Sequence, residues 1–329
     1  MKKLLILLFL ISAVSVAQIS KVDFDKQKKI ISGNDPKIAL SNQEFLEKKF
    51  PNDAQVLCLR GLYQFRDSDP NGALMSFSKA IKTNPKLAFA YACRSQVFAQ
   101  KQLIEKAIGD ISQAISLEPK NAEWVNLRAG FYYLLQKLDL GLEDKKTLIK
   151  LEPNQIMNYF DAATFAKELD NNTNADIYFD QAYANKNIQK YITDVLFAKF
   201  LLRFRRFEEA KTKYESALLT NEKDFGNEDL HDVGIVFYKL KNYEKAIIFI
   251  KKAIALNRND ANYFVNLASV YLDKKEYQNV KQTAEMALKV DSNNSMANMF
   301  MAIGLKYTGN ETLAIQYEEK AKQLDKNQN

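Results

Sequence analysis

The sequence contains few of the residues from which metal sites and catalytic centres are built. Its 329 residues include one histidine, His231, and two cysteines, Cys58 and Cys93. A single imidazole cannot form a His-rich metal site, and the two cysteines lie too far apart for the usual spacing of zinc ligands. A Ser–His–Asp arrangement would have to use His231. We therefore expect no metal, no cofactor and no enzymatic activity, and we interpret His231 as an ordinary polar surface residue.

Glycine and proline are scarce as well. The ten glycines are scattered, so the chain has no Gly-rich loop of the kind that cradles phosphate groups. All six prolines lie at or before Pro153, and the second half of the chain has none. Because proline ends helices, this distribution indicates two parts that differ in regularity.

The first 17 residues have the three parts of a secretory signal peptide. Lys2 and Lys3 precede an apolar run over residues 4–11, and Ser15, Val16 and Ala17 place small residues before Gln18. The run is too short for a comfortable membrane span. We predict a signal peptide at residues 1–17, and an exported, soluble protein, periplasmic or extracellular, that does not insert into the membrane after cleavage.

The charge gives no indication of nucleic-acid binding. The formal net charge of +7 falls to +5 when the signal peptide takes away Lys2 and Lys3, and charges of both signs are interleaved. Nucleic-acid binding requires a concentrated basic face. We expect no nucleic acid among the partners.

The chain does contain a repeating pattern of small and apolar residues. In steps of 34 residues it appears as Ala73, Phe77, Ala80 and Pro85, then as Ala107, Ile111, Ala114 and Pro119, and in weaker form as Gly141, Lys145, Leu148 and Pro153. A further small residue, in a preceding first helix, occupies Gly61, Ser95 and Ala129. Small residues let two antiparallel helices approach closely, and proline stops the second of them. The pattern therefore predicts an all-α stack of helix pairs.

The same pattern divides the chain. Residues 18–53 are predicted to be a degenerate N-terminal capping repeat with helices near 21–32 and 37–49, and residues 54–186 a regular array of repeats 1–4. Residues 187–329 are predicted to be a looser array of repeats 5–8, with its last helix as a cap. Spacings of 35 and 36 residues between Ala175, Ala210 and Ala246 place extra residues in turns near Asn187 and residues 224–226. In the regular part, Arg94 and Arg128 are expected to pair with Asp110 and Asp144.

A 34-residue period of two helices resembles the tetratricopeptide-repeat family over nearly the whole chain after residue 17. Residues 118–133 and 238–256 are close to its consensus. The resemblance implies an α-solenoid, a right-handed superhelix of antiparallel helix pairs, with about eight repeats after the degenerate first one. It also implies a concave groove, lined by the first helix of each pair, that holds an extended segment or a helix of a partner.

This implied groove provides the candidate binding residues. The cations expected on it are Lys167, Lys199, Arg203 and Lys239, with Arg205 and Arg206 in the adjoining turn; the aromatic residues are Phe65, Tyr133, Phe160 and Tyr238. Cys58 and Cys93 are expected on the groove faces of adjacent first helices, either as a disulfide or as two free thiols. Arg forks suit carboxylates, so the predicted ligand is a protein or peptide, and specifically an acidic extended segment. The same cations could instead only solubilise the surface and pair with Asp161, Glu168 or Asp232.

The leading hypothesis from sequence is thus a non-enzymatic, exported scaffold or adaptor for a protein or peptide segment. The alternative is a solenoid of the cell envelope that binds glycan or cell-wall material through the groove aromatics.

Overall fold

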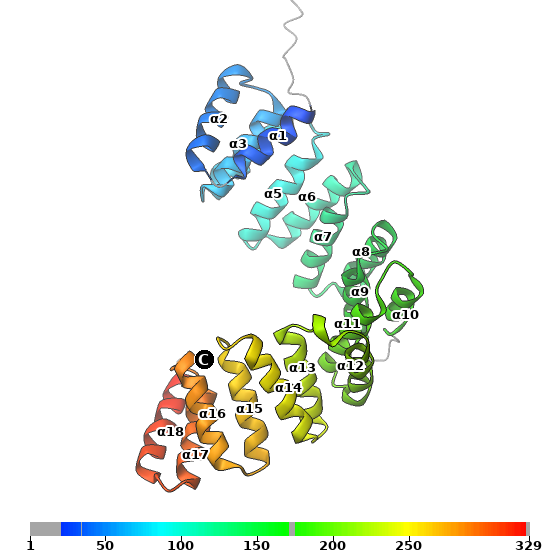
Figure 1. Cartoon of the computed structure of the whole chain (residues 1–329). Helices are drawn as coiled ribbons and strands as arrows, with labels where there is room; N and C mark the ends of the chain where they lie inside the picture. The colour runs from blue at the N-terminus through cyan, green and yellow to red at the C-terminus, as the bar shows by residue number, and fades with distance from the viewer. Residues whose placement is uncertain (1–20, 34, 171–174, 327–329) are drawn as a thin grey trace, which may run out of the picture. The chain divides into compact units, whose positions relative to one another are not determined.

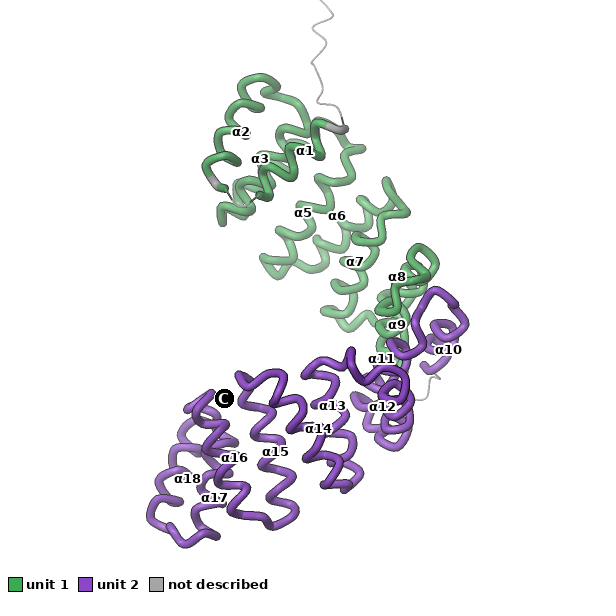
Figure 2. The backbone as a smooth tube through the Cα atoms, viewed as in Figure 1, with its two compact units in different colours: residues 1–174 green, residues 175–329 purple. Residues whose placement is uncertain are grey.

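The computed structural model describes residues 21–33, 35–170 and 175–326, and the predicted signal peptide lies outside these ranges. All regular structure within the described ranges is helical (Figure 1). The all-α solenoid of helix pairs predicted from the sequence is therefore confirmed. The chain divides into two compact units, residues 1–174 and 175–329 (Figure 2). The boundary predicted after residue 186 concerns the regularity of the repeats and stays a prediction.

The first unit contains nine helices in its described part. They are α1 (Lys21–Ile31), α2 (Pro36–Lys49), α3 (Ala54–Arg66), α4 (Pro70–Thr83), α5 (Ala88–Gln100), α6 (Ile104–Leu117), α7 (Ala122–Leu134), α8 (Leu138–Leu151) and α9 (Ile156–Leu169). Helices α1 and α2 lie where the two helices of the capping repeat are expected. From α3 onward each helix packs against the next one along the chain.

The second unit has the same plan with a short first member. Its helices are α10 (Ile177–Ala184), α11 (Lys190–Arg203), α12 (Phe207–Asn221), α13 (Asn227–Lys239), α14 (Tyr243–Leu256), α15 (Ala261–Asp273), α16 (Tyr277–Val290), α17 (Ser295–Tyr307) and α18 (Glu311–Lys326). A 3₁₀ turn, η1 (Glu222–Asp224), follows α12 where the sequence has its extra residues.

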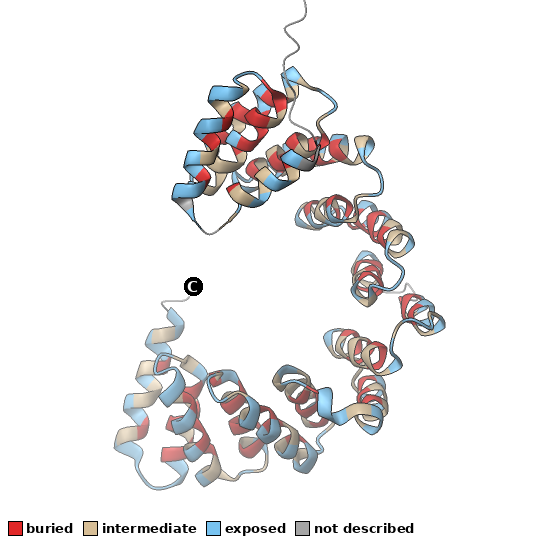
Figure 3. Ribbon diagram, turned by 45° about the horizontal axis from the view of Figure 1, so that its top comes forward, coloured by how far each residue is buried: buried red, intermediate tan, exposed pale blue. Residues whose placement is uncertain are grey.

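Small residues set the distance between the helices of a pair. Ala73, Ala107, Ala114 and Ala253 have no exposed surface. Within each unit, buried residues follow the helix faces that meet their neighbours (Figure 3). At Gly61, a methyl group would lie 2.7 Å from the Phe77 ring, so this close approach requires a residue without a side chain or a shift of the ring. The repeating residues of the sequence are therefore contact points between helices.

Ion pairs join the helices of the regular part. Arg94 forms two hydrogen bonds with the Asp110 carboxylate, at 2.6 and 2.8 Å. Arg128 forms the same pair with Asp144, at 2.9 and 2.6 Å. Both carboxylates are buried, and each arginine also donates to a serine hydroxyl of the preceding second helix. The pairing predicted from the sequence is confirmed.

The two cysteines lie elsewhere than expected. Cys58 is fully buried and Cys93 is 6% exposed, within the core cluster that contains Val56 and Phe77. Helices α3 and α5 contact each other, and both thiols are covered and do not face a groove. Both thiols are free. Burial, followed by a hydrogen bond with Cys93, raises the pKa of the Cys58 thiol well above its ordinary value.

Most turns that end a first helix share an unusual backbone conformation. The turns after α3, α5, α7, α11, α13, α15 and α17 each have one residue with positive φ at the same place in the repeat, namely Ser68, Gln102, Gln136, Arg205, Lys241, Lys275 and Gly309. After α5, Gln102 N–H donates to the Ala99 carbonyl and Leu103 N–H to the Phe98 carbonyl, which is a Schellman motif. Only one of the seven positions is glycine, although this conformation disfavours any residue with a side chain.

We predict that glycine at this turn stabilises the protein. Gln102→Gly, at φ 60°, should raise the free energy of unfolding by about 0.5–1 kcal/mol, because relief of backbone strain outweighs the greater freedom of glycine in the unfolded chain. Gln113→Gly is the matched control, since Gln113 is an exposed residue inside α6; it should cost about 1 kcal/mol. Chemical denaturation measures both, and a loss of stability in Gln102→Gly would contradict the prediction.

Candidate functional site

Side chains on successive first helices of the second unit bond to one another. Lys199 Nζ on α11 lies 2.7 Å from Asp229 Oδ1 on α13. His231 Nε2 on α13 lies 2.9 Å from Asn266 Nδ2 on α15. We call these four residues the first-helix ladder. These residues lie on α11, α13 and α15, which are among the first helices predicted from the sequence to line the groove. The candidate binding residues of the second unit are therefore described in relation to them.

The charge of Lys199 is matched inside the ladder. Burial alone would lower its pKa, but the bond to Asp229 and the charges of Asp232 and Glu228 raise it overall. Lys199 is therefore a cation held by an ion pair with Asp229, which the charges of two further carboxylates favour. The ion-pair partner of Lys199 is thus Asp229, which is not among the three acids that the sequence suggested as partners of the groove cations.

The side chain of His231 contacts residues of both α13 and α15. Its ring stacks on Tyr263 of α15 at a centroid distance of 4.6 Å, and the Tyr263 hydroxyl accepts a hydrogen bond of 2.8 Å from Asn227 of α13. The other ring nitrogen, Nδ1, lies 3.8 Å from Asp232. Each of these contacts joins or orients α13 and α15. The ring is thus a half-buried polar connection between two first helices.

An aromatic and a cationic side chain lie together at the end of α13. The Tyr238 ring is 6.3 Å from that of Tyr243, and Lys239 Nζ lies 5.4 Å from the Tyr238 centroid. Burial and then a hydrogen bond to Asp273 raise the pKa of Tyr238 to about 12. Tyr238 thus keeps its proton at neutral pH, and Lys239 remains exposed beside it.

The three arginines near the end of α11 have different surroundings. Arg203 is exposed, with its guanidinium carbon 5.8 Å from the Phe204 ring, and Arg205 is exposed in the positive-φ turn. Arg206 forms two bonds of 2.7 Å with Asp176 and also binds Glu209. The bonds to Glu209 and Asp176 raise the pKa of Arg206. Arg206 is therefore part of an ion network between α12 and the residue before α10.

Two of the four candidates of the first unit pack against other side chains. The Tyr133 ring lies 5.4 Å from the Phe165 ring, and Phe65 packs on the core cluster around Val56. Phe160 and Lys167 are half-buried on α9. The structure brings Lys199 and Arg203 together on α11, and Tyr238 and Lys239 on the adjoining α13.

Two features were missed by the reasoning from sequence. One is the pairing of His231 with Asn266 and Tyr263, for which the only sequence signal is a spacing of about one repeat. The other is a cluster around the buried Asp194, with Tyr183, Lys190, Lys213 and Ser216. Its members come from three helices, and no local motif marks them.

Two further observations on the described residues concern metal-binding groups and membrane-spanning helices. Within the described ranges, no group of three or more His, Cys, Asp or Glu side chains could hold a metal ion. In the same ranges, no helix has both the length and the apolar character needed to cross a bilayer.

Comparison with known proteins gives matches to parts of the sequence. A family model described as tetratricopeptide repeat matches residues 230–260. Serine/threonine-protein phosphatase 5 of Rattus norvegicus is 27% identical over 135 residues, which is 40% of this chain and 26% of that protein. Hsp70-Hsp90 organizing protein 1 of Glycine max is 25% identical over 130 residues, 40% of this chain and 22% of that protein. The chain thus spans about a quarter of the length of these relatives.

Solved structures match over a larger share of the chain. A tetratricopeptide repeat protein from Parabacteroides merdae has a TM-score of 0.53 at 16% identity, covering 77% of this chain and 98% of its own. Yeast Tom70 has a TM-score of 0.52 at 18% identity, covering 94% of this chain and 66% of its own. At such identities the likeness concerns the fold alone. With the family match at residues 230–260 and the helix pairs described above, the chain is a tetratricopeptide-repeat α-solenoid in fold.

Proposed function

We propose that the protein is a non-enzymatic, exported scaffold that binds an extended segment of another protein along its first helices. The solenoid fold supports this, because stacked helix pairs present long surfaces suited to partner segments. The matching relative from Glycine max carries a name that describes the organisation of two other proteins, and the match covers 40% of this chain. Export rests on the signal peptide predicted at residues 1–17.

The observation that carries the proposal is the pair of exposed cations on α11 and α13. Arg203 lies beside the Phe204 ring, and Lys239 lies beside the Tyr238 ring. The two helices contact each other. A cation next to an aromatic face offers a partner both charge and apolar area. An extended segment with acidic side chains would match exposed cations that lie beside aromatic rings on two neighbouring first helices.

We predict that reversing these two charges weakens binding of an acidic peptide. The probe is a fluorescein-labelled, unstructured Glu/Ser-rich peptide, and its affinity is measured by fluorescence anisotropy. Arg203→Glu with Lys239→Glu should weaken binding by about three- to tenfold, and added salt should weaken binding to the wild type. Lys320→Glu with Lys322→Glu on α18 is the matched control and should leave the affinity unchanged.

Other outcomes of this experiment would contradict the proposal or favour the alternative function. Equal losses in both double variants, or binding that does not respond to salt, would remove α11 and α13 from the proposal. A Lys/Ser-rich peptide serves as the charge control. Binding of soluble peptidoglycan fragments in place of either peptide would favour the alternative function, a glycan- or cell-wall-binding solenoid that uses Tyr238 and its neighbours.

A further inference from the structure

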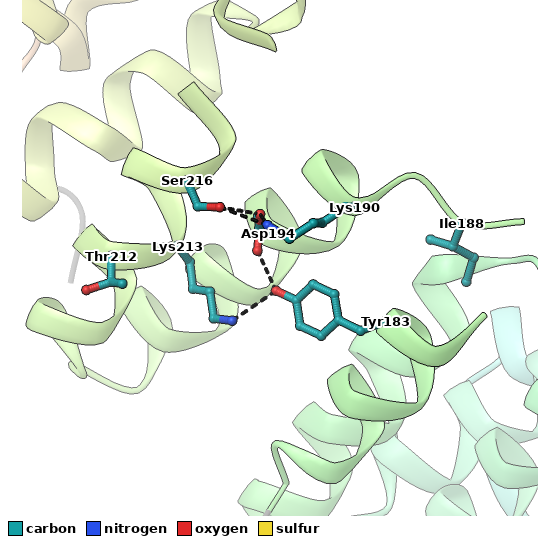
Figure 4. A pocket seen from close by; sticks show the side chains of 7 residues that line it. All are labelled: Tyr183, Ile188, Lys190, Asp194, Thr212, Lys213 and Ser216. Atoms are coloured by element: carbon teal, nitrogen blue, oxygen red, sulfur yellow. Dashed lines mark hydrogen bonds and ion pairs between the residues drawn. The ribbon is translucent and has the colours of Figure 1, made fainter. Parts of the chain in front are cut away.

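A cavity of about 490 Å³ lies in the second unit, and none of the candidate residues of the predicted groove lines it. Its lining residues are Tyr183, Ile188, Lys190, Asp194, Thr212, Lys213 and Ser216 (Figure 4). Tyr183 belongs to the second helix α10, and Lys213 and Ser216 to the second helix α12. The first helix α11 contributes only its opening turns, through Lys190 and Asp194. The size is that of a pocket for a small molecule.

The buried carboxylate of Asp194 organises the polar side of the cavity. Asp194 is only 1% exposed. It accepts hydrogen bonds from the Tyr183 hydroxyl at 2.5 Å, from the Ser216 hydroxyl at 2.8 Å and from Lys190 Nζ at 2.9 Å. Figure 4 shows these three groups converging on it. The carboxylate is therefore satisfied within the protein and is not a free acceptor for a ligand.

Two lysines provide the N–H groups of the cavity that remain available to a ligand. The hydroxyls of Tyr183 and Ser216 each have one proton, and both protons are donated to Asp194. Lys190 uses two of its three N–H groups, toward Asp194 and Ser216. Lys213 uses one, toward the Tyr183 oxygen at 3.1 Å. The remaining N–H groups belong to two ammonium ions, so the cavity has an excess of charged donors.

Contacts with two aromatic rings hold the ammonium group of Lys213 in place. Its Nζ lies 4.7 Å from the Tyr183 ring centroid and 4.8 Å from that of Phe197. Within the part of the chain that the structure describes, it has no ion pair with a carboxylate. Burial and the contact with Asp194 raise the pKa of Tyr183, which keeps its hydroxyl protonated and its bond to Asp194 intact. Asp180, one turn before Tyr183, also contributes to that shift but does not line the cavity.

We propose that this cavity is a binding site for a small organic anion. A carboxylate or phosphate group would accept hydrogen bonds from Lys213 and Lys190, and the apolar part of the ligand would lie against Ile188 and the Tyr183 ring. Charge-assisted hydrogen bonds of this kind are the strong ones. The site is formed mainly by second helices, so it is separate from the proposed peptide surface, and either proposal can fail without the other.

The test uses phenyl phosphate and benzoate as probes, with the neutral benzamide as the matched control. Isothermal titration calorimetry on the full chain should show binding of at least one anion with a dissociation constant near or below about 1 mM, and benzamide should bind at least about tenfold more weakly. Tighter binding of phenyl phosphate identifies a phosphate site, and tighter binding of benzoate a carboxylate site.

Variants of two lysines on one helix complete the test. Lys213→Gln should weaken anion binding by about tenfold or more, whereas Lys213→Arg should retain most of it. Lys211→Gln is the control, because Lys211 also lies on α12 but does not line the cavity. Circular dichroism confirms that each variant is folded. The proposal is overturned if neither anion binds, if benzamide binds as well as benzoate, or if Lys213→Gln and Lys211→Gln behave alike.

Discussion

Ala253→Leu is expected to lower the free energy of unfolding by about 1–3 kcal/mol, the usual cost of overpacking a filled core. Ala253 has no exposed surface and lies on α14, which packs against both α13 and α15. One turn earlier in the α13–α14 pair, a methyl group on Gly234 would lie 2.6 Å from Ile250. There is accordingly no room between the two helices for the additional carbon atoms of leucine.

The same helix provides the control for this prediction. Ala255 is exposed, two residues from Ala253 on α14. Ala255→Leu makes the identical chemical change and should leave the midpoint of urea denaturation nearly unchanged. Ala114→Leu and Ala268→Leu should behave like Ala253→Leu, since both alanines are fully buried. Similar midpoints for Ala253→Leu and Ala255→Leu would show that the assignment of the repeat positions is wrong.

The repeat framework could be predicted from the sequence because it depends on residue size. Ala107 and Ala114 are conspicuous where leucine would be expected in an amphipathic helix, and both are fully buried between helices. The Arg94–Asp110 pair could be predicted for a similar reason, since both partners recur at fixed places in the repeat. Local spacing contains this information, because the two helices of a pair are adjacent in the chain.

Contacts between neighbouring repeats could not be predicted in the same way. Lys199 was expected to give positive charge to the groove, but its charge is matched by Asp229, about one repeat later in the chain. Cys58 and Cys93 were expected on a surface and lie in the core between α3 and α5. In each case the sequence predicted the face of the helix on which the residue lies. It did not predict how one repeat is rotated relative to the next, and this rotation decides which side chains are covered.

Lys145 is the sharpest departure of the sequence from its own pattern. It occupies the position held by Phe77 and Ile111 in the preceding repeats, and the side chain is only 7% exposed. The ammonium group donates to Asp161 at 2.6 Å and to Asn126 at 2.6 Å, and lies 5.9 Å from the Phe165 ring. A lysine can replace an apolar residue here because its alkyl chain fills the space and its charge is paired with that of Asp161.

Asp161→Ala should therefore destabilise the first unit strongly. The substitution leaves the Lys145 ammonium buried with only the Asn126 amide oxygen, and removal of one partner of a buried pair costs about 3–5 kcal/mol. We expect the lower end of this range, because the Asp161 side chain is one-third exposed and water can reach part of the site. The measurement is urea denaturation followed by circular dichroism.

Removing the other partner should have a much smaller effect. Lys145→Met keeps an unbranched side chain of similar length next to Phe165, and the partly exposed Asp161 can be hydrated, so we expect a change within about 1 kcal/mol. The double variant, Lys145→Met with Asp161→Ala, should recover most of the stability lost in Asp161→Ala, because no buried charge remains. Equal losses in the two single variants, or no recovery in the double variant, would mean that water hydrates the Lys145 ammonium group. Either result would contradict the interpretation of Lys145 as a buried charge.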